Sequence, residues 1–521
     1  MTTQLAPTAG TAAPAAGAPV RLSLREEVRL TAEEDALLVE HPSAVFRLRK
    51  LAPELRAAIE LMRHRPVDLH GALADAAQCQ ADVVAERLGR LLRYHVAGED
   101  GRDALWIEPM AAVAHRPTPV AADAPLRMSG FALIRAYQDG LVLESPLSAH
   151  RVRLRSSGAQ ALAAATGRAT TAAELSATLG LPVGTVRYLV GHLAGAGLLD
   201  LAERGEFGEE RDETLRQWDF HDLLFHARSR LGRHDYPFGG VFPHRGVIDP
   251  QPATKPTASF AVVPAAESAA DRCAIALPRP RIDRLLERDP SLTAALEGRR
   301  SVRQYAAEPI SLDQLGEFLY RSARVRSLTE ARPHEGMPYP ASSRPYPTGG
   351  AAYDLELYLT VHRCAGVPQG IYHYDPVGHQ LVLVNRDRKD CEALLALARL
   401  SAGGADPADL LITVTSRFQR LSWKYRSLAY AATLKNVGVL YQTMYLVATT
   451  MGLAPCALGG GDSDLAARVL GLDYLRESSV GEFLLGSRPA GLGPQRGDWE
   501  PVNDPGWSAE AERALGPQGR A

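Results

Sequence analysis

The chain has 521 residues, and its 58 lysines and arginines nearly balance its 60 aspartates and glutamates. Because a single hydrophobic core does not hold so long a chain, we expect two or three domains. The balanced charge gives no field that would concentrate nucleic acid or an anionic membrane, so we predict neither as a partner.

The cysteines and the N-terminal segment favour a reducing, cytoplasmic location. The five cysteines are odd in number, lie far apart and form no Cys-x-x-Cys pair, which argues against a disulfide framework and a thiolate zinc site. Residues 1–20 are rich in Ala, Pro, Thr and Gly and lack the basic and apolar regions of a signal peptide. We therefore predict a disordered tail there.

One pattern occurs twice between Arg21 and Asp200, at a spacing of about a hundred residues. Residues 38–42, followed by Arg47-Leu48-Arg49, resemble residues 142–146, followed by Arg153-Leu154-Arg155. Segments with helical periodicity come next in both copies.

The apolar residues of these segments predict two small modules. The first copy has two helical stripes, made of Leu51, Leu55, Ile59 and Met62, and of Val84, Leu88, Leu91 and Leu92. The second copy has one, which follows Leu181-Pro182-Val183 and consists of Val186, Leu189, Val190 and Leu193. With residues 105–107 as a short wing strand, we predict tandem winged-helix-like modules over residues 21–115 and 125–205.

A winged helix raises the question of DNA binding. Between Val183 and Ala196 the only long polar side chains are Arg187 and His192, too few for phosphate and base contacts in a major groove. The first copy has Arg87, Arg90 and Arg93 but also Asp82 and Glu86, as on an ordinary solvated helix face. Duplex binding is therefore disfavoured.

Prolines recur from Pro243 to about Arg281, which forbids a continuous helix and predicts an extended connector over residues 206–285. A tail is expected over residues 496–521, and a further domain over residues 286–495. Its first helical stretch ends near Gly298. Ser311-Leu312-Asp313-Gln314 is a capping box for a helix that reaches about Arg324.

Strands and one long helix are expected in the rest of this domain. The strand candidates cover residues 355–361, 370–374, 380–384 and 410–415. Ser427 to Met451 is apolar but contains Lys435, Asn436 and Gln442, so it is interpreted as a buried central helix rather than a membrane span.

Arg299, Ser301 and Arg303 form the first candidate binding site. In an extended chain alternate side chains project to one side, so two guanidinium groups and a hydroxyl would face a phosphate together. The alternative is an ordinary arginine run on the surface.

Two glycine-containing segments are candidates for contact with a flat ligand. Thr348, Gly349 and Gly350 follow a stretch stiffened by prolines, and Gly459 and Gly460 come after the long helix. Between them, Lys424 and Tyr425 place an amine beside a phenol. Taken singly, the first glycine segment is a turn, the second is a loop, and the spacing around Lys424 and Tyr425 favours an exposed basic helix start.

Five segments resemble, in their order and in their sequences, the SagB-type dehydrogenases of the nitroreductase superfamily. They are residues 299–303, 347–350, 370–375, 423–426 and 452–460. The resemblance covers about residues 296–489, and residues 218–230 are similar to a segment that precedes the flavin domain in these proteins. It implies a nitroreductase-like α+β domain that binds FMN, normally in a homodimer, and oxidises thiazoline or oxazoline rings in ribosomally made peptides. The N-terminal modules resemble PqqD-like elements that recognise precursor peptides.

The resemblance also implies roles for single residues. Arg299, Ser301 and Arg303 would hold the FMN phosphate and ribityl chain. Backbone near the isoalloxazine would come from Gly349, Gly350, Gly459 and Gly460, with Thr348 where the family has serine. Lys424 and Tyr425 would be the catalytic pair, because aromatising an azoline removes a proton as well as a hydride. Which of the two is the base stays open.

Two other functions remain open. The chain could be an NAD(P)H-dependent nitroreductase-like reductase of small molecules, or a non-catalytic scaffold that binds peptide or DNA. For the dehydrogenase, separate cyclodehydratase proteins of the same pathway are expected as partners, since nothing here suggests an ATP-using cyclising domain. His221 and His226 do not share a helical face, so no metal is predicted. Cys456 is expected to be a small core residue.

Overall fold

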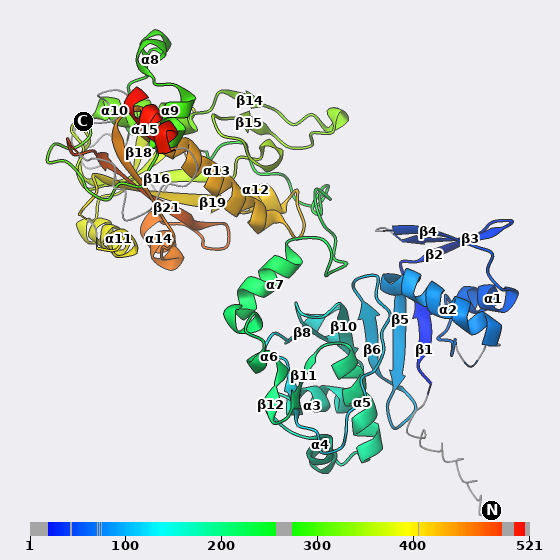
Figure 1. Cartoon of the computed structure of the whole chain (residues 1–521). Coiled ribbons are helices and arrows are strands. Elements are labelled where there is room, and N and C mark those ends of the chain that lie inside the picture. Colours follow the sequence, from blue (N-terminus) through cyan, green and yellow to red (C-terminus); the bar gives the residue numbers. More distant parts are fainter. Residues whose placement is uncertain are drawn as a thin grey trace, which may run out of the picture. The chain divides into compact units, whose positions relative to one another are not determined.

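The computed structural model describes residues 19–41, 44–69, 71, 73, 75–256, 274–404, 406–491 and 505–515. Most of the expected N-terminal tail, residues 1–18, and Cys273 lie outside these ranges. The chain divides into two compact units, Met1–Pro237 and Phe238–Ala521 (Figure 1). The boundary falls inside the connector that was expected over residues 206–285.

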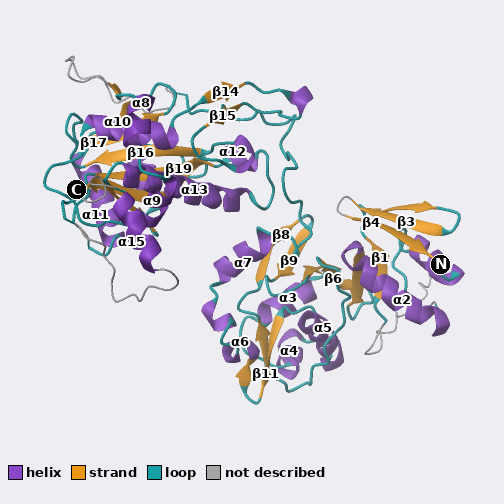
Figure 2. Cartoon of the chain, turned by 45° about the horizontal axis from the view of Figure 1, so that its top comes forward, coloured by secondary structure: helices purple, strands orange, loops and turns teal. Residues whose placement is uncertain are grey.

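The N-terminal unit contains three antiparallel sheets, whose strands are orange in Figure 2. The largest has the order β1-β5-β6-β10-β9-β8, with bounds Arg21–Leu24, Leu92–Ala97, Asp103–Pro109, His150–Leu154, Gly140–Glu144 and Leu133–Tyr137. The second is β2-β3-β4, with bounds Arg29–Ala32, Ala36–His41 and Ala44–Arg49. The third is β12-β11-β7, with bounds Glu206–Phe207, Leu199–Glu203 and Leu126–Met128.

The internal repeat corresponds to two three-stranded meanders, β2-β3-β4 and β8-β9-β10, each followed by helices. After the first come α1 (Pro53–Leu61) and α2 (Asp75–Leu88). After the second come α3 (Ser157–Ala165), α4 (Ala172–Leu179) and α5 (Val183–Gly195). The apolar stripe expected on α5 is confirmed, because all four of its residues are buried.

The first copy differs from the expected module in two places. The helix ends at Leu88, and Leu92 already begins β5. The expected wing strand is part of β6, in the middle of the large sheet, where Ile107 pairs with Val152 of the second copy. One core extends from Leu22 to Leu199, so the two copies share a sheet and a core.

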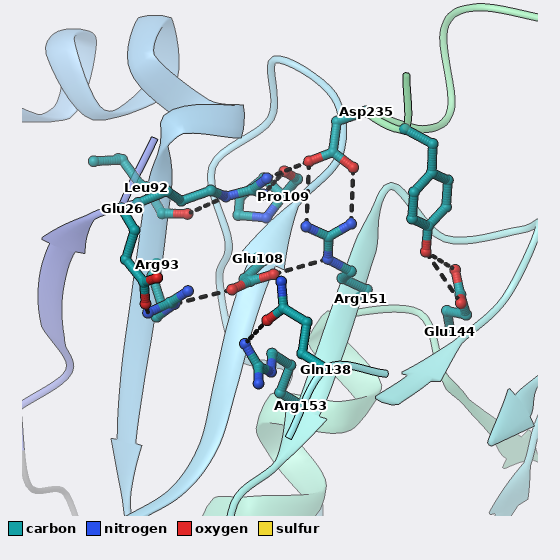
Figure 3. Close-up of polar contacts among 12 residues, drawn as sticks. Glu26, Leu92, Arg93, Glu108, Pro109, Gln138, Glu144, Arg151, Arg153 and Asp235 are labelled. Atoms are coloured by element: carbon teal, nitrogen blue, oxygen red, sulfur yellow. Dashed lines mark hydrogen bonds and ion pairs between the residues drawn. The ribbon is translucent and has the colours of Figure 1, made fainter. Parts of the chain in front are cut away.

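The other face of the large sheet carries a buried ionic network (Figure 3). Glu108 on β6 is 2% exposed and accepts hydrogen bonds from Arg93 at 2.9 Å and from Arg151 at 2.8 Å. Burial would raise the pKa of Glu108, but Arg151, Arg25 and Arg93 lower it to about 2. Arg151 also binds Asp235 at 2.9 Å, and Arg25 forms an ion pair with Asp235 as well.

Asp235 follows α7 (Phe220–Arg228) and α6 (Gly208–Arg211), which were expected to belong to a connector. Because Asp235 is bound by two buried arginines, this segment is an integral part of the N-terminal unit.

The C-terminal unit is an α+β domain around one antiparallel sheet with the order β13-β18-β17-β16-β19-β21-β20. Its strands are Ala274–Ala276, Gln380–Asn385, Gly370–Asp375, Leu355–Val361, Leu410–Arg417, Glu477–Ser487 and Leu453–Leu458, in that order. One face packs against α10 (Leu312–Ala323) and α13 (Ala429–Thr450). The other face packs against α11 (Arg388–Ser401) and α14 (Ser463–Leu470), drawn below the sheet in Figure 1.

The elements predicted for this unit are confirmed within about two residues, including the capping box of α10 and the central helix α13. Among the described residues, no helix has the length and apolar character needed to cross a membrane. The smaller elements are α8 (Ile282–Arg288), α9 (Leu292–Gly298), α12 (Gln419–Ser422), and the hairpin of β14 (Ser327–Thr329) and β15 (Ala341–Ser343). The expected C-terminal tail contains α15 (Pro505–Ala514), whose Trp507 indole donates to Glu297 on α9.

Residues 239–256, which we call the strap, were expected to be free connector and instead pack on α12. The Phe242 amide donates to the Lys424 carbonyl at 3.0 Å, and the Trp423 indole donates to the Ile248 carbonyl at 2.7 Å. Arg417 and Arg420 donate to carbonyls of residues 251–253. Residues 257–273 of the expected connector lie outside the described residues, and its last part, residues 274–285, contains β13 and the start of α8 instead of free connector.

Candidate active site

Lys424 and Tyr425 lie in the short turn between α12 and α13. The Tyr425 amide still donates to the Leu421 carbonyl at 2.7 Å, and Ser427, with φ +63°, separates the two helices. Both side chains reach Gly350. A Cβ atom on Gly350 would overlap Lys424 Nζ and would lie 2.7 Å from the Tyr425 hydroxyl. The missing side chain of Gly350 therefore makes room for the predicted catalytic pair at the predicted ligand-contacting loop.

The ammonium of Lys424 is surrounded by aromatic rings. It lies 4.7 Å from the ring centroid of Tyr339, 5.2 Å from that of Tyr425 and 5.9 Å from that of Phe242. It also donates a hydrogen bond to the Tyr339 hydroxyl. In the described part of the chain no carboxylate pairs with Lys424. The amine is thus held by groups that leave it available for proton transfer.

The loop that carries Thr348, Gly349 and Gly350 has an unusual backbone. Gly350, Ala351 and Tyr353 have φ values of +61°, +52° and +43°. Side chains disfavour this left-handed region, and such strain persists only where neighbouring contacts hold it. Two hydrogen bonds do so here: the Tyr353 amide donates to Thr348 Oγ1 at 3.1 Å, and the Gly349 amide donates to Asn436 Oδ1 at 3.2 Å.

Asp354 fixes the orientation of Asn436. Its carboxylate is fully buried and accepts hydrogen bonds from Asn436 Nδ2 at 2.8 Å, Ser416 Oγ at 2.7 Å and Thr433 Oγ1 at 3.0 Å. Because the amide nitrogen of Asn436 faces Asp354, its oxygen faces Gly349.

Arg299, Ser301 and Arg303 lie in an extended segment against β20 and α13. The Arg299 guanidinium is 5.2 Å from the Tyr445 ring centroid, and Ser301 Oγ is 2.6 Å from the Tyr445 hydroxyl. Arg303 is exposed. Neither arginine pairs with a carboxylate among the residues that the structure describes. Two unneutralised guanidinium groups and a hydroxyl fit a phosphate dianion.

Gly459 and Gly460 continue this site beyond the end of β20. The Ala457 amide donates to the same Tyr445 hydroxyl at 2.8 Å, which places the two glycines near Ser301. Both are exposed, and a Cβ atom on Gly459 would meet no other atom within 4 Å. This open backbone fits contact with a flat ring system. The neighbouring Gly461 packs on the carboxylate of Glu482, whose pKa is raised to about 7 by burial.

The predicted residues thus form two groups. We call Thr348, Gly349, Gly350, Lys424 and Tyr425 the lysine half-site, and Arg299, Ser301, Arg303, Gly459 and Gly460 the arginine half-site. Both contact α13, the first through Asn436 and the second through Tyr445. These two residues are nine positions apart, about two and a half turns at roughly 3.6 residues per turn, so they face opposite sides of the helix.

Sequence analysis missed several contributors, chiefly Phe242, Tyr339, Asp354 and Tyr445. None of them stands in a segment with a recognisable spacing. Asn436 was used only as an argument against a membrane span, although a polar residue in a buried helix could also have signalled a buried partner. Cys456 is fully buried on β20, as expected, and burial raises the pKa of its thiol.

The histidines that were considered for metal binding are separate. His226 stacks on Trp218, whereas His221 groups with Asp219 and Asp222 within metal-binding distance. All three residues of that group are exposed, and such groups are common on surfaces without a metal ion.

Two family models match the chain. The model of the nitroreductase family matches residues 296–487, a range that contains both half-sites. The model described as cyanobactin oxidase ThcOx matches residues 126–235, in the N-terminal unit.

Two relatives are similar to part of the chain. A nitroreductase-like protein of Methanocaldococcus jannaschii is 30% identical over 161 residues, which are 31% of this chain and 74% of that protein. The microcin B17-processing protein McbC of Escherichia coli is 30% identical over 139 residues, which are 25% of this chain and 49% of McbC. The chain thus spans about half the length of McbC.

Solved structures are less similar. A nitroreductase-like protein of Ralstonia eutropha has 20% identity and a TM-score of 0.32, with 49% of this chain and 99% of that chain covered. A chain of the E. coli microcin synthetase McbBCD complex, with truncated pro-MccB17 bound, has 19% identity and a TM-score of 0.30, with 55% and 100% covered. The sequence matches, rather than these superpositions, carry the family assignment.

Proposed function

This chain belongs to the nitroreductase family, and on that premise we propose that it is an FMN-dependent dehydrogenase of the SagB type. It oxidises thiazoline or oxazoline rings in a ribosomally made peptide to the corresponding azoles. The observation that carries the proposal is the meeting of Lys424 Nζ and the Tyr425 hydroxyl at Gly350. The similarity to a cyanobactin oxidase and to a microcin-processing protein supports the choice of a peptide substrate.

The arginine half-site would hold the phosphate end of FMN, and the glycines of both half-sites would leave the backbone free of side chains beside its ring system. Bound FMN would supply the acceptor for a hydride from one ring carbon of the azoline, with oxygen as the final electron acceptor. Lys424 and Tyr425 take the proton from the neighbouring ring carbon, onto the amine nitrogen or the phenol oxygen. Among the described residues, aromatic rings rather than carboxylates surround that nitrogen.

The opposite orientation of the two half-sites on α13 favours a homodimer in which each FMN site takes one half-site from each chain. A single helix cannot turn both sides toward one ligand. Two exposed apolar side chains on one face of the same helix support this, since Tyr430 and Leu434, about one turn apart, are 48% and 39% exposed. Large side chains on one face of a helix are typical of a subunit interface.

The N-terminal unit holds the precursor peptide. Its repeated meander-and-helix pattern supports two winged-helix-like, PqqD-like modules that share one sheet, and nucleic acid is not a ligand. Cyclodehydratase proteins of the same pathway supply the azoline.

A direct comparison of substrates tests the proposed function. The purified chain, yellow with FMN, is incubated in air with a short thiazoline peptide, or with NADH and a nitroaromatic compound. Oxidation of the peptide without NADH supports the dehydrogenase. Turnover of the nitroaromatic alone favours a reductase, and a colourless inactive protein favours a scaffold.

A further inference from the structure

Tyr339 joins the lysine half-site from a separate part of the chain, just before β15. It is 7% exposed, and its ring packs near Trp423 and Phe242 with centroid distances of 6.2 and 6.3 Å. The chain separation from Lys424 is 85 residues. The packing fixes the ring independently of its hydroxyl.

The Tyr339 hydroxyl makes two hydrogen bonds. It donates its single proton to the Gly350 carbonyl at 2.7 Å, so it acts as an acceptor toward Lys424 Nζ. One phenol oxygen therefore connects the amine to the glycine whose missing side chain makes room for it.

We propose that Tyr339 is a positioning residue that holds the Lys424 amine against Gly350. This inference rests on the proposed function and deepens it. Lysine has a long flexible stem, and in the described part of the chain Lys424 has no carboxylate to fix its end. The Tyr339 oxygen supplies that fixed point, and the aromatic rings restrict the stem. Accurate placement of the Lys424 amine matters because the rate of proton transfer falls steeply when the base is displaced.

Tyr339→Phe is the informative variant, because it keeps the packed ring and removes only the hydroxyl. Tyr372→Phe is a matched control: Tyr372 is 4% exposed, lies on β17, and its hydroxyl donates to a backbone carbonyl, that of Pro368, at 2.9 Å. Thermal unfolding and flavin retention of both variants check that the fold is kept.

The first measurement is the acetylation rate of Lys424 by an N-hydroxysuccinimide ester at fixed pH, followed by peptide mass spectrometry. Exposed Lys435 in the same chain serves as the reference. We expect the Lys424 rate to rise several-fold in Tyr339→Phe, because the amine is released, and to stay unchanged in Tyr372→Phe. This measurement needs no azoline, so its outcome is independent of the proposed function.

The second measurement is steady-state oxidation of an azoline peptide. In Tyr339→Phe we expect kcat to fall about ten- to a hundredfold while KM stays nearly constant, because a displaced base lowers the chemical step and leaves binding intact. Unchanged acetylation of Lys424 overturns the positioning role, even if the chain oxidises azolines. Increased acetylation with no azoline oxidation by the unmodified chain supports the positioning role and contradicts the proposed function.

Discussion

The backbone amide of Phe242 donates a 3.0 Å hydrogen bond to the carbonyl of Lys424, so the strap directly supports the turn that carries Lys424 and Tyr425. Gly239 and Arg426 extend this contact with a reciprocal pair of backbone hydrogen bonds, at 3.2 and 3.0 Å. The strap begins directly after the N-terminal unit, which ends at Pro237.

Two truncations separate the strap from the N-terminal unit. A chain of residues 238–521 keeps the strap, and we expect it to bind FMN and oxidise a short azoline peptide. It should lose its preference for the full precursor, because the N-terminal unit no longer contributes binding energy from parts of the peptide remote from the azoline. A chain of residues 257–521 should oxidise neither the short azoline peptide nor the full precursor. Competition between the two peptides, followed by mass spectrometry, measures the preference, and equal preference in residues 238–521 and the full chain would contradict the peptide-binding role.

Gly350→Ala should displace the catalytic pair. The new Cβ would overlap Lys424 Nζ, and φ is +61°, where a side chain costs about 1–2 kcal/mol. Gly336→Ala is the matched control, since φ there is +78° and a Cβ would meet no atom within 4 Å. Both variants should lose similar thermal stability, but only Gly350→Ala should lose azoline turnover. Equal turnover would show that Gly350 does not make room for Lys424.

Arg303→Ala should weaken FMN binding about ten- to a hundredfold, because it removes one charge-assisted contact to the phosphate. Fluorescence titration of the flavin-free protein with FMN measures the affinity. Arg388→Ala, at an 83% exposed arginine on α11, is the control and should bind FMN normally. The same affinity in both variants would remove Arg303 from the phosphate site.

Much of the C-terminal unit could be predicted because its helices and strands are indicated by patterns of residues that are close together in the sequence. The strand over residues 355–361 shows the alternation of side chains typical of a strand, and Ser311 and Gln314 form the reciprocal capping box of α10. Prediction from the sequence failed where an element is determined by contacts with residues far away in the chain. The pairing of Ile107 with Val152 places the expected wing inside a sheet, and no periodicity signals it.

The strap and Tyr339 escaped prediction for the same reason. A proline-rich segment was interpreted as connector because it cannot be a helix, yet its carbonyls accept hydrogen bonds, as Pro252 does from Arg417. Tyr339 meets Lys424 across 85 residues. The site residues that could be named in advance came from family resemblance, and those that position them came only from the structure.

The N-terminal unit should lose stability as the pH falls from 6.5 toward 4. Burial lowers the pKa of His150 and of His192 to about 4 and also lowers that of His115, which bonds to His192 at 2.8 Å. The unfolded chain binds these protons near pH 6.5 and the folded chain does not, so each contributes a loss of up to about 1.4 kcal/mol per pH unit.

Pulse proteolysis in urea, with detection of fragments from residues 92–199, measures this stability. His192→Gln should show a weaker pH dependence between pH 6.5 and 5. His221→Gln, at a side chain that is 78% exposed, should follow the unmodified protein. A stability that does not change over this interval would mean that the buried histidines are protonated in the fold.

The mass of an azoline peptide after incubation with the purified protein, FMN and oxygen tests the central claim most directly. The account predicts a loss of two hydrogens for each ring with the unmodified chain. With Lys424→Ala or Tyr425→Phe it predicts retained flavin and a rate lower by about 10²- to 10⁴-fold. The double variant should resemble the slower single variant, because the two residues act as one unit. An unchanged peptide mass with the flavin-loaded chain, or parent rates in both single variants, would contradict the account.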